Sequence, residues 1–430
     1  MSLTRFAPSP TGRLHVGNLR QALHNQLYAQ KTGGRFLLRI DDTDRERSRE
    51  EYVKAIRTDL AWFGLHPDSE VRQSARFDLY EREFERLRAS GRVYPAYETA
   101  EELDLRRKIL LGRGLPPVYE RRESEAPPAG RRPHWRFRLD WDAPIAWTDL
   151  VRGEQRFDPR KLSDPVVRRE DGTWLYLLPS VIDDIDLGVT TVIRGEDHVS
   201  NTAVQLQMFE ALGSPAPQFA HTALLTGSEG KLSKRLGSLD VDALRADGIE
   251  PLALAALLAR LGTSQPVEPI DSLDQLAAAF DFAYFGRAPA RFDLAELEGL
   301  NAKLVHRLPF AAVRDRLPAG MDEGSWVAIR PNLRRVGDAA DWWHVVQGPV
   351  APLEEERDYL AEAAAVARTI DWSSDPWHAL TDALKARTGR KGKALFLPLR
   401  RALTGRDHGP DMAALLPLIG RARALERLSA

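Results

Sequence analysis

The first fifty residues place a strand, a loop and a helix in an order that constrains the fold more than any other feature. Residues 3–6 form a short apolar strand, and the His-Val-Gly-Asn sequence at 15–18 stands at the start of a helix that ends near Gly33, before a second strand at 35–40. The first turn of a helix presents unpaired N–H groups and a positive dipole end, which attract anions. Gly17 leaves room for a nucleobase or ribose. The pattern predicts a strand-loop-helix-strand unit that binds a nucleotide at the helix start.

Later segments continue this α/β pattern. Ser48 and Glu51 have the spacing of a capping box for a helix whose apolar stripe ends at Gly64. An apolar strand at 189–193 is followed by polar residues and by a helix that begins near Asn201. This order is typical of the second half of a doubly wound parallel sheet.

The remaining sequence predicts further domains. Residues 120–132 are rich in proline and charge, as in a loop, and apolar residues alternate over 135–139, as in a strand, so we expect an insertion between the two halves of the sheet. Pro251 opens a helix rich in alanine and leucine, and most of the last third has helical patterning. A chain of 430 residues is too long for one core and should form several domains.

A basic cluster follows a flexible turn in the middle of the chain. Preorganised cations stabilise the charge that builds on an α-phosphate and on departing pyrophosphate during nucleotidyl transfer. Alone, such a cluster is typical of a solvated basic turn. Its combination with the phosphate-binding helix start favours a catalytic interpretation. The turn occupies 227–230, and the cluster comprises Lys231, Ser233, Lys234 and Arg235.

A second basic cluster lies near the C-terminus, with no Asp or Glu between residues 385 and 406. The apolar strip 395–399 interrupts it, so we expect the cations to project from a packed helical domain. Such one-signed charge is equally typical of a solvated face and of a nucleic-acid contact. The basic residues are Lys385, Arg387, Arg390, Lys391, Lys393, Arg400, Arg401 and Arg406.

Taken in order, the segments 5–12, 38–45, 193–198 and 231–235 resemble the class I glutamyl-tRNA synthetases, with 15–18 as the HIGH motif and 231–235 as the KMSKS loop. The resemblance extends from residue 1 to the low 300s, and more loosely to the end. It implies an α/β fold with four parts. These are a Rossmann-type doubly wound parallel sheet (1–78 and 179–226), an inserted α+β acceptor-end-binding domain (79–178), a stem-contact domain carrying the KMSKS-like loop (227–308) and a helical anticodon-binding domain (309–430).

The resemblance also implies roles for individual residues. The implied catalytic residues are His15, Gly17, Asn18, Lys231, Ser233, Lys234 and Arg235. The implied ATP-binding residues are Pro10, Thr11, His15, Gly17, Glu196 and Lys234. The implied glutamate-binding residues are Arg5, Ala7, Ser9, Asp41, Tyr176, Ser180 and Arg194, whose arginines suit bidentate binding of carboxylates. The implied tRNA-binding residues are Arg387, Lys391, Lys393, Arg400 and Arg401.

Two of the implied glutamate-binding residues depart from the family's pattern. Asp41 stands where the family usually has a glutamate for the substrate amino group, and Ser180 stands where an asparagine is common. Because Asp41 is one methylene shorter, we expect it to reach the amino group only through water.

The implied reaction has two steps and uses ATP as a substrate together with Mg²⁺. The α-carboxylate of glutamate attacks the α-phosphate to give glutamyl-adenylate and pyrophosphate, and the terminal adenosine hydroxyl of tRNA-Glu or tRNA-Gln then attacks the activated carbonyl, releasing AMP. Positioning and charge stabilisation suffice for such chemistry. The alternatives are a transferase that glutamylates a modified tRNA base, which resembles only the catalytic half, a nucleotidyltransferase and a catalytically silent tRNA-binding paralogue. Pyrophosphate exchange with glutamate and tRNA separates them.

Composition excludes several kinds of site. The chain has no cysteine, which excludes disulfides and thiolate ligands, and the stretch 94–97 lacks the cysteines with which many family members bind zinc, so we predict no zinc or other metal site. The longest apolar stretch, 252–261, is too short for a bilayer, and the N-terminus lacks the features of a signal peptide. We expect a cytoplasmic monomer without membrane contact whose partners are tRNA, L-glutamate and ATP.

Overall fold

The computed structural model describes residues 1–121, 128–227, 230–231 and 240–429, which form two compact units. The first unit comprises Met1–Ala246 and Leu254–Asp293. The second comprises Asp247–Ala253 and Leu294–Ala430. Within the described ranges, every helix is too short or too polar to span a lipid bilayer.

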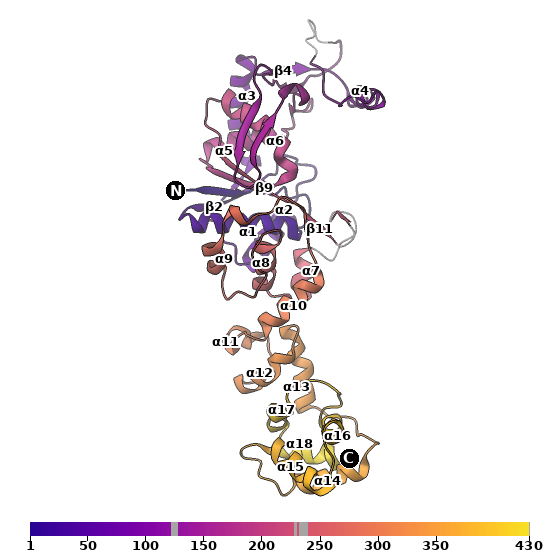
Figure 1. Cartoon of the computed structure of the whole chain (residues 1–430). Helices are drawn as coiled ribbons and strands as arrows, with labels where there is room; N and C mark the ends of the chain where they lie inside the picture. Colours follow the sequence, from indigo (N-terminus) through magenta and orange to yellow (C-terminus); the bar gives the residue numbers. More distant parts are fainter. Residues whose placement is uncertain (122–127, 228–229, 232–239, 430) are drawn as a thin grey trace. The chain divides into compact units, whose positions relative to one another are not determined.

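A parallel sheet forms the centre of the first unit (Figure 1). One part has the order β1-β2-β3, and the other pairs β9 with β10. The two parts meet where the N–H of Thr190, just before β9, donates to the carbonyl of Leu3 in β1 at 3.0 Å. The predicted doubly wound sheet is therefore confirmed, with its switch point between β1 and β9. The strands are β1 (Leu3–Phe6), β2 (Arg35–Ile40), β3 (Ser69–Arg72), β9 (Thr191–Gly195) and β10 (Gln218–Thr222).

Helices pack on this sheet because their apolar residues recur at helical spacing. Leu37 of β2 and Val192 of β9 share a buried core with residues of three of the helices, including Tyr80 and Leu178. The helices are α1 (Val16–Lys31), α2 (Glu50–Trp62), α3 (Phe77–Ala89), α5 (Leu177–Asp186) and α6 (Val199–Ala211).

The start of α2 corrects one prediction. The helix begins at Glu50, its N-cap is Arg49, and no side chain caps it, so the predicted capping box at Ser48 is wrong. The predicted apolar stripe is present, since Val53, Ile56 and Leu60 are buried. The first turn instead carries two carboxylates, Glu50 and Glu51, whose negative charges interact favourably with the positive end of the helix dipole.

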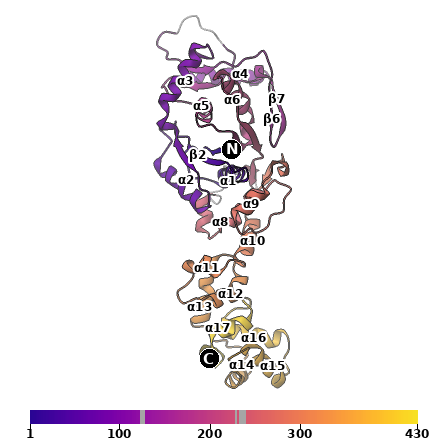
Figure 2. The same ribbon diagram turned by 90° about the vertical axis from the view of Figure 1, so that its left-hand side faces the viewer.

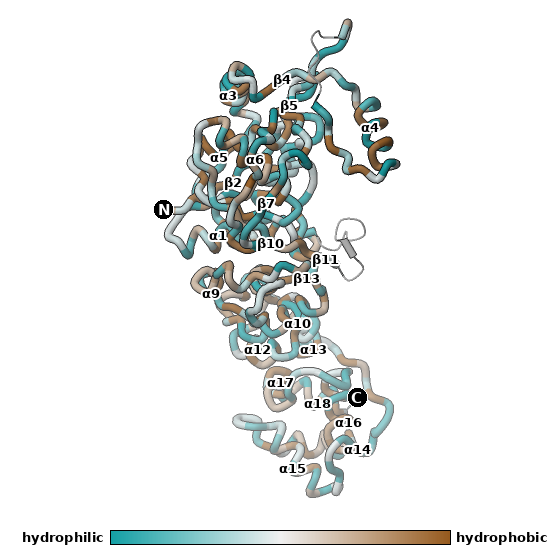
Figure 3. Tube along the Cα trace, turned by 45° about the horizontal axis from the view of Figure 1, so that its top comes forward, coloured by the Kyte–Doolittle hydropathy of each residue, from teal (hydrophilic) through white to brown (hydrophobic). Residues whose placement is uncertain are grey.

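An α+β segment is inserted between the two halves of the sheet, as predicted (Figure 2). It contains an antiparallel sheet of order β4-β5-β8 and a β6-β7 hairpin. Helix α4 buries none of its residues, and Figure 3 colours several of its turns as hydrophobic. The elements are β4 (Val93–Ala96), α4 (Ala100–Gly112), β5 (His134–Phe137), β6 (Ile145–Asp149), β7 (Gly153–Phe157) and β8 (Val166–Arg168).

Arg20 of α1 fixes the next part of the chain to the sheet. Its buried guanidinium donates to the carbonyls of Ala223, Leu258 and Leu261 at 2.8, 3.3 and 2.7 Å. Burial lowers the pKa of Arg20 to about 10. One side chain thereby joins α1, the end of β10 and the last turn of α8. The elements of this part are β11 (Leu225–Gly227), β12 (Gly230–Lys231), α7 (Val241–Ala246), α8 (Pro251–Arg260), α9 (Leu273–Ala279) and β13 (Ala290–Arg291).

The second unit is helical, as predicted for the last third of the chain. Its core includes Trp326, which is fully buried and donates from its indole N–H to the carbonyl of Leu308 at 2.9 Å. The helices are α10 (Leu294–Val305), α11 (Phe310–Val313), α12 (Glu323–Ile329), α13 (Ala339–Gln347), α14 (Arg357–Ala367), α15 (Pro376–Thr388), α16 (Lys393–Thr404), α17 (Met412–Ile419) and α18 (Arg421–Ser429).

Candidate active site

His15 is the N-cap of α1, at the carboxyl-terminal edge of the sheet. Its Nδ1 accepts hydrogen bonds from the backbone N–H groups of Gly17 and Asn18 at 3.1 and 3.4 Å, and the Asn18 side chain accepts from the N–H of His15 at 3.3 Å. A Cβ on Gly17 would lie 2.9 Å from the His15 ring, so this position requires glycine. Because Nδ1 accepts, the neutral ring carries its proton on Nε2. Partial burial lowers the pKa of His15 and favours this neutral form, against the attraction of Asp240.

The segment that follows the lysine cluster lies beside His15. Asp240 forms an isolated antiparallel bridge with His15, and the N–H of Val241 donates to the carbonyl of Leu14 at 3.1 Å. At the other end of the cluster, Lys231 pairs with Thr226 in the β11-β12 hairpin. Of the predicted catalytic residues, Ser233, Lys234 and Arg235 lie outside the described residues. The described residues Asp240 and Val241 lie at the start of α1.

The other residues predicted to bind ATP lie on loops at the same edge. Pro10 is buried and its carbonyl accepts from the N–H of Arg49 at 3.0 Å, whereas Thr11 is exposed. Glu196 forms an ion pair with Arg152, and its second oxygen accepts from the N–H of Leu224 at 3.2 Å. Glu196 is thus already held by the protein on both oxygens.

Arg194, in β9, is a buried guanidinium among neutral partners. It donates to the Tyr176 hydroxyl at 2.9 Å, to Gln205 at 2.7 Å, to Thr202 at 2.5 Å and to His221 Nε2 at 3.3 Å. Burial lowers its pKa, because the cation has lost its water. Across the described part of the chain, no carboxylate forms an ion pair with Arg194. Such an arrangement suits an anionic ligand, since a buried charge without a counterion is costly.

Arg5, the second predicted carboxylate-binding arginine, already has a partner. Both of its donating nitrogens contact Asp184 of α5, at 3.2 and 3.3 Å. Arg39, in β2, also donates to Asp184, at 2.8 Å. Arg5 and Arg39 therefore share one carboxylate. The predicted neighbours Ala7 and Ser9 lie on the loop after β1, where Ala7 is half-buried and Ser9 is exposed.

Arg39 also holds the two residues that depart from the family's pattern. It donates to both oxygens of Asp41, at 2.7 and 3.1 Å, and to the Ser180 hydroxyl at 3.0 Å. Burial raises the pKa of Asp41 to about 6 despite the attraction of Arg39. Asp41 and Ser180 thus belong to one buried network around a single guanidinium.

Most of the cations around this network have carboxylate partners within the protein. Arg5 and Arg39 face Asp41 and Asp184, which balances two cations with two anions. The neighbouring Asp183 is held by Arg76 at 2.7 Å. Arg76 also contacts Asp186, and of these four arginines Arg194 alone has no carboxylate in ion-pair contact among the described residues, so its guanidinium is open to an anionic ligand.

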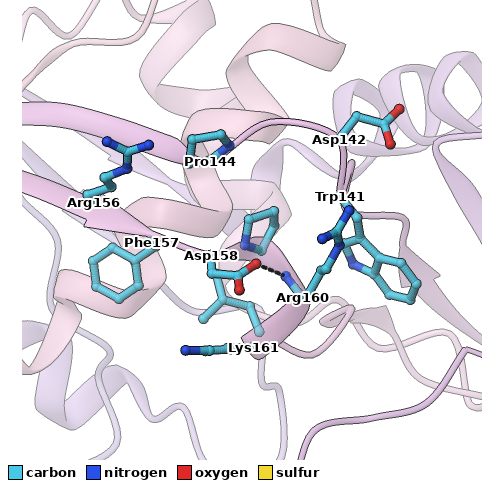
Figure 4. Close-up of a pocket in the computed structure, with 10 residues that line it drawn as sticks. Trp141, Asp142, Pro144, Arg156, Phe157, Asp158, Arg160 and Lys161 are labelled. Atoms are coloured by element: carbon cyan, nitrogen blue, oxygen red, sulfur yellow. Dashed lines mark hydrogen bonds between the residues drawn. The ribbon is translucent and has the colours of Figure 1, made fainter.

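A separate cavity of about 710 Å³ lies in the inserted segment, at the open end of the β6-β7 hairpin (Figure 4). The aromatic rings of Trp141 and Phe157 line it together with the cations Arg156, Arg160 and Lys161. The three cations are exposed. No ion pair is formed by any of them with the described residues, so all three are available to an anion.

The predicted tRNA-binding residues differ in whether their side chains already bind other residues of the protein. Arg387 pairs with Glu362 at 2.9 Å, Arg401 pairs with Asp407 at 2.6 Å, and Arg400 donates to the carbonyl of Pro410 at 3.0 Å. Lys391 and Lys393 are exposed at the turn between α15 and α16, and within the described ranges neither forms an ion pair. These two lysines are the cations of the set most available to a nucleic acid.

Comparison with known proteins defines the class of protein first. Residues 2–298 match the family of class I tRNA synthetases (E and Q), catalytic domain, and residues 350–430 match an anticodon-binding domain. These matches and the site at the helix start define a class I tRNA synthetase.

Full-length relatives define the family within that class. The chain is 68% identical to "Glutamate--tRNA ligase 1" of Rhizorhabdus wittichii, covering 100% of this chain and 99% of the relative, and 68% identical to "Glutamate--tRNA ligase 2" of Sphingopyxis alaskensis, covering 99% and 98%. A crystal structure of a glutamate tRNA ligase from Elizabethkingia meningosepticum, in complex with its amino acid, matches with a TM-score of 0.86 at 27% identity, covering 99% of this chain and 98% of that one. The chain belongs to the glutamate–tRNA ligase family.

Sequence reasoning missed several residues that form the site. Arg39 and Asp184 form the centre of the charged network. His221 accepts a hydrogen bond from Arg194, and Asp149 binds the other ring nitrogen of His221. Arg39 interrupts an otherwise apolar strand, and this was a usable signal, because a charge in a buried strand needs partners. Asp149 and His221 carry no comparable local signal, since their importance arises only from tertiary contacts.

Proposed function

We propose that this chain activates L-glutamate with ATP to form glutamyl-adenylate and then transfers the glutamyl group to the 3′ end of tRNA, releasing pyrophosphate and AMP. The observation that carries the proposal is the buried Arg194 without a carboxylate partner. Glutamate carries a net charge of −1 and supplies the missing anion, whereas neutral glutamine leaves the guanidinium unpaired. Four of the five guanidinium N–H groups of Arg194 are already donated to protein acceptors, so the remaining N–H, on Nη1, is available to the side-chain carboxylate.

In this proposal ATP lies across the start of α1. The positive end of the α1 dipole and the Nε2–H of His15 face its phosphates, while Lys231, Ser233, Lys234 and Arg235 meet the charge that grows on the α-phosphate and on pyrophosphate. Pro10, Thr11 and Gly17 border the nucleotide, and Glu196 keeps the loop after β9 in place through Arg152 and Leu224. Mg²⁺ accompanies the triphosphate and offsets part of its charge.

Asp41 and Ser180 receive the amino end of the substrate. Arg39 orients both side chains, and the short Asp41 leaves space for a water between its carboxylate and the substrate ammonium. The Tyr176 hydroxyl accepts a hydrogen bond from Arg194, and the loop with Ala7 and Ser9 closes the pocket beside Arg5. The α-carboxylate then points toward the α-phosphate of ATP, and no covalent enzyme intermediate is needed.

We infer that tRNA contacts two regions. Lys391 and Lys393, together with Arg387, Arg400 and Arg401, bind the anticodon arm through its phosphates. The inserted segment binds the acceptor end. Its cavity at the open end of the β6-β7 hairpin offers the rings of Trp141 and Phe157 for stacking on bases and three exposed cations for binding phosphates.

The four-part domain division proposed from the sequence places these functions along the chain. Residues 1–78 and 179–226 hold the reactants, 79–178 the acceptor end, 227–308 the stem and 309–430 the anticodon. We further infer a cytoplasmic monomer without structural zinc, which agrees with the absence of cysteine.

The test is aminoacylation of purified tRNA-Glu and tRNA-Gln with radiolabelled glutamate. Glutamate should become attached to tRNA-Glu, tRNA-Gln or both in an ATP-dependent reaction that releases pyrophosphate. Binding of tRNA without any charging would instead identify a silent tRNA-binding protein. Labelling that survives mild alkaline deacylation of the 3′ ester would point to a modified base as the acceptor.

A further inference from the structure

Arg194 and His221 are register partners on the neighbouring strands β9 and β10. Arg194 Nε donates to His221 Nε2 at 3.3 Å, and the Thr202 hydroxyl lies 2.9 Å from the same ring nitrogen. The other ring nitrogen, Nδ1, lies 2.5 Å from Oδ2 of Asp149. Asp149 and His221 are both buried. The three charged or titratable side chains therefore form a line from the inserted segment to the glutamate pocket.

Each hydrogen bond in this line restricts the proton positions of the next. Oδ1 of Asp149 accepts from the backbone N–H groups of Val151, Arg152 and His221 at 3.0, 2.9 and 3.1 Å. These bonds and the His221 contact hold the pKa of Asp149 below its usual range, so the carboxylate is ionised and accepts from Nδ1. Burial lowers the pKa of His221. The neutral imidazole then has its proton on Nδ1, and its bare Nε2 accepts from Arg194.

We propose that Asp149 and His221 are positioning residues that fix the plane of the Arg194 guanidinium, and that the inserted segment thereby sets the affinity for the substrate's side-chain carboxylate. The inference rests on the proposed role of Arg194. Arg194 is then held in place partly by Asp149, which belongs to the inserted segment and not to the sheet that contains Arg194. A guanidinium that lost its Nε acceptor would keep its charge and its bonds to Tyr176, Thr202 and Gln205, but the edge that carries Nε would no longer be held, and the position of the remaining N–H depends on the orientation of the guanidinium plane that this bond fixes.

We call the hydrogen-bonded chain from Asp149 through His221 to Arg194 the relay. The isosteric variant Asp149→Asn tests it. Its Oδ1 still accepts the three backbone N–H groups, but its amide N–H₂ faces Nδ1 and moves the ring proton to Nε2, where it opposes Arg194 Nε–H. We expect the KM for glutamate to rise about tenfold or more, because a buried donor is left unpaired, while the KM for ATP changes less than twofold. ¹⁵N NMR of the ring nitrogens should report the exchanged proton. The control Asp164→Asn alters another buried carboxylate of the inserted segment, one that binds Arg121 and Tyr94, and should leave both KM values unchanged.

Two substitutions at His221 keep the test decisive if Asp149→Asn folds poorly. His221→Gln offers Arg194 an oxygen acceptor and should raise the glutamate KM less than threefold, whereas His221→Leu offers none and should match Asp149→Asn. Equal effects of the two His221 variants, or a fall in kcat and Tm with no change in the glutamate KM, would overturn the relay. Arg194→Gln separates the two proposals. If it leaves the glutamate KM unchanged, the proposed role of Arg194 fails, and if it raises that KM while Asp149→Asn and His221→Leu do not, the relay alone fails.

The pH dependence gives a second readout. The charged and titratable groups around His221 are Asp149, Arg194, Arg152 and His198, and the burial that lowers its pKa keeps the ring neutral near pH 7. Protonation at lower pH adds a proton at Nε2 and removes the acceptor of Arg194. At acidic pH the unaltered chain should lose glutamate affinity through this step in addition to the titration of Asp41, and His221→Gln should keep only the Asp41 part. An identical acidic step in His221→Gln would contradict the relay.

Discussion

Asp240 pairs with His15 across an isolated antiparallel bridge, although the two residues stand far apart in the sequence. His15 caps the helix at which a triphosphate would bind, and Asp240 follows directly on the segment that contains the lysine cluster. The fold therefore brings Asp240, which follows the lysine cluster in the sequence, to the start of α1, and the two motifs each lead to a separate prediction.

Lys234→Ala should slow adenylate formation by about 10² to 10³ and change the Kd for tRNA less than threefold, because the ammonium meets charge that develops mainly in the transition state. Rapid-quench measurement of adenylate and filter binding of tRNA give the two values. Equal losses in both, or no loss in either, would count against the assignment of this lysine.

His15→Asn separates the two functions of the histidine. Asparagine is a good N-cap, so the variant should lose less than about 0.5 kcal/mol of stability, while His15→Ala should lose about 1 kcal/mol. Both variants lack the Nε2–H donor and should slow adenylate formation by about 10² to 10³. The measurements are thermal unfolding and single-turnover kinetics. A His15→Asn enzyme with normal rate would restrict His15 to a structural role.

Glutamate binding should weaken as the pH falls through about 6. Burial raises the pKa of Asp41 to about 6, so its carboxylate is ionised above that pH and can attract the substrate ammonium only there. The glutamate KM should rise about tenfold by pH 5, since the ionised fraction falls tenfold per pH unit below the pKa. By the same linkage, ionising Asp41 opposes folding, so its contribution to stability falls as the pH rises from about 4 to 6.

The control for this pH effect is Asp41→Asn. It should have a high glutamate KM whose remaining dependence between pH 5 and 7 lacks the Asp41 step. An unchanged pH profile in this variant would assign the titration to another group.

Reversing the charge of both Lys391 and Lys393 to glutamate should raise the KM for tRNA about tenfold at low salt and leave kcat unchanged. The difference from the unaltered chain should shrink as salt rises, because phosphate contacts release counterions. Lys54→Glu, at an exposed position of α2, controls for altered net charge when it is compared with the single variant Lys391→Glu, which changes the charge by the same amount. A tRNA KM that responds equally to the control would show only a general charge effect.

Arg20→Met should lower the thermal stability of the first unit markedly. The guanidinium satisfies three buried carbonyls, and each carbonyl left unpaired costs about 1–3 kcal/mol. Calorimetry should therefore record a lower Tm for the unfolding step of this unit, with the step of the helical unit unchanged. Arg260→Met, which removes a single exposed bond to Glu268, should have a much smaller effect. A similar fall in Tm for the two variants would contradict this account of Arg20.

The sequence predicted the parts of the fold that depend on local patterns. The strand and helix around His15, the second half of the sheet from residue 189, the insertion and the helical last third follow from apolar periodicity and turn residues, and all are present. The start of α2 was misplaced because the Ser48 hydroxyl matches a capping pattern by spacing alone, and hydrogen-bond geometry decides a cap.

The network around the glutamate pocket could be predicted only in part. Arg5 and Arg194 were identified through the family resemblance, but their different partners depend on which helices face β1 and β9. Asp184 pairs with Arg5 from α5, and no pattern near either residue specifies that contact. That Arg194 has no carboxylate in ion-pair contact among the described residues is a property of the tertiary structure.

The most direct test of the account is ATP–pyrophosphate exchange in the presence of tRNA, with glutamate or glutamine as substrate, for the unaltered chain and for Arg194→Gln. The account predicts exchange that depends on glutamate, about a hundredfold weaker exchange with glutamine, and loss of this preference in Arg194→Gln. Equal exchange with both amino acids in the unaltered chain, or an undiminished preference for glutamate in the variant, would contradict it.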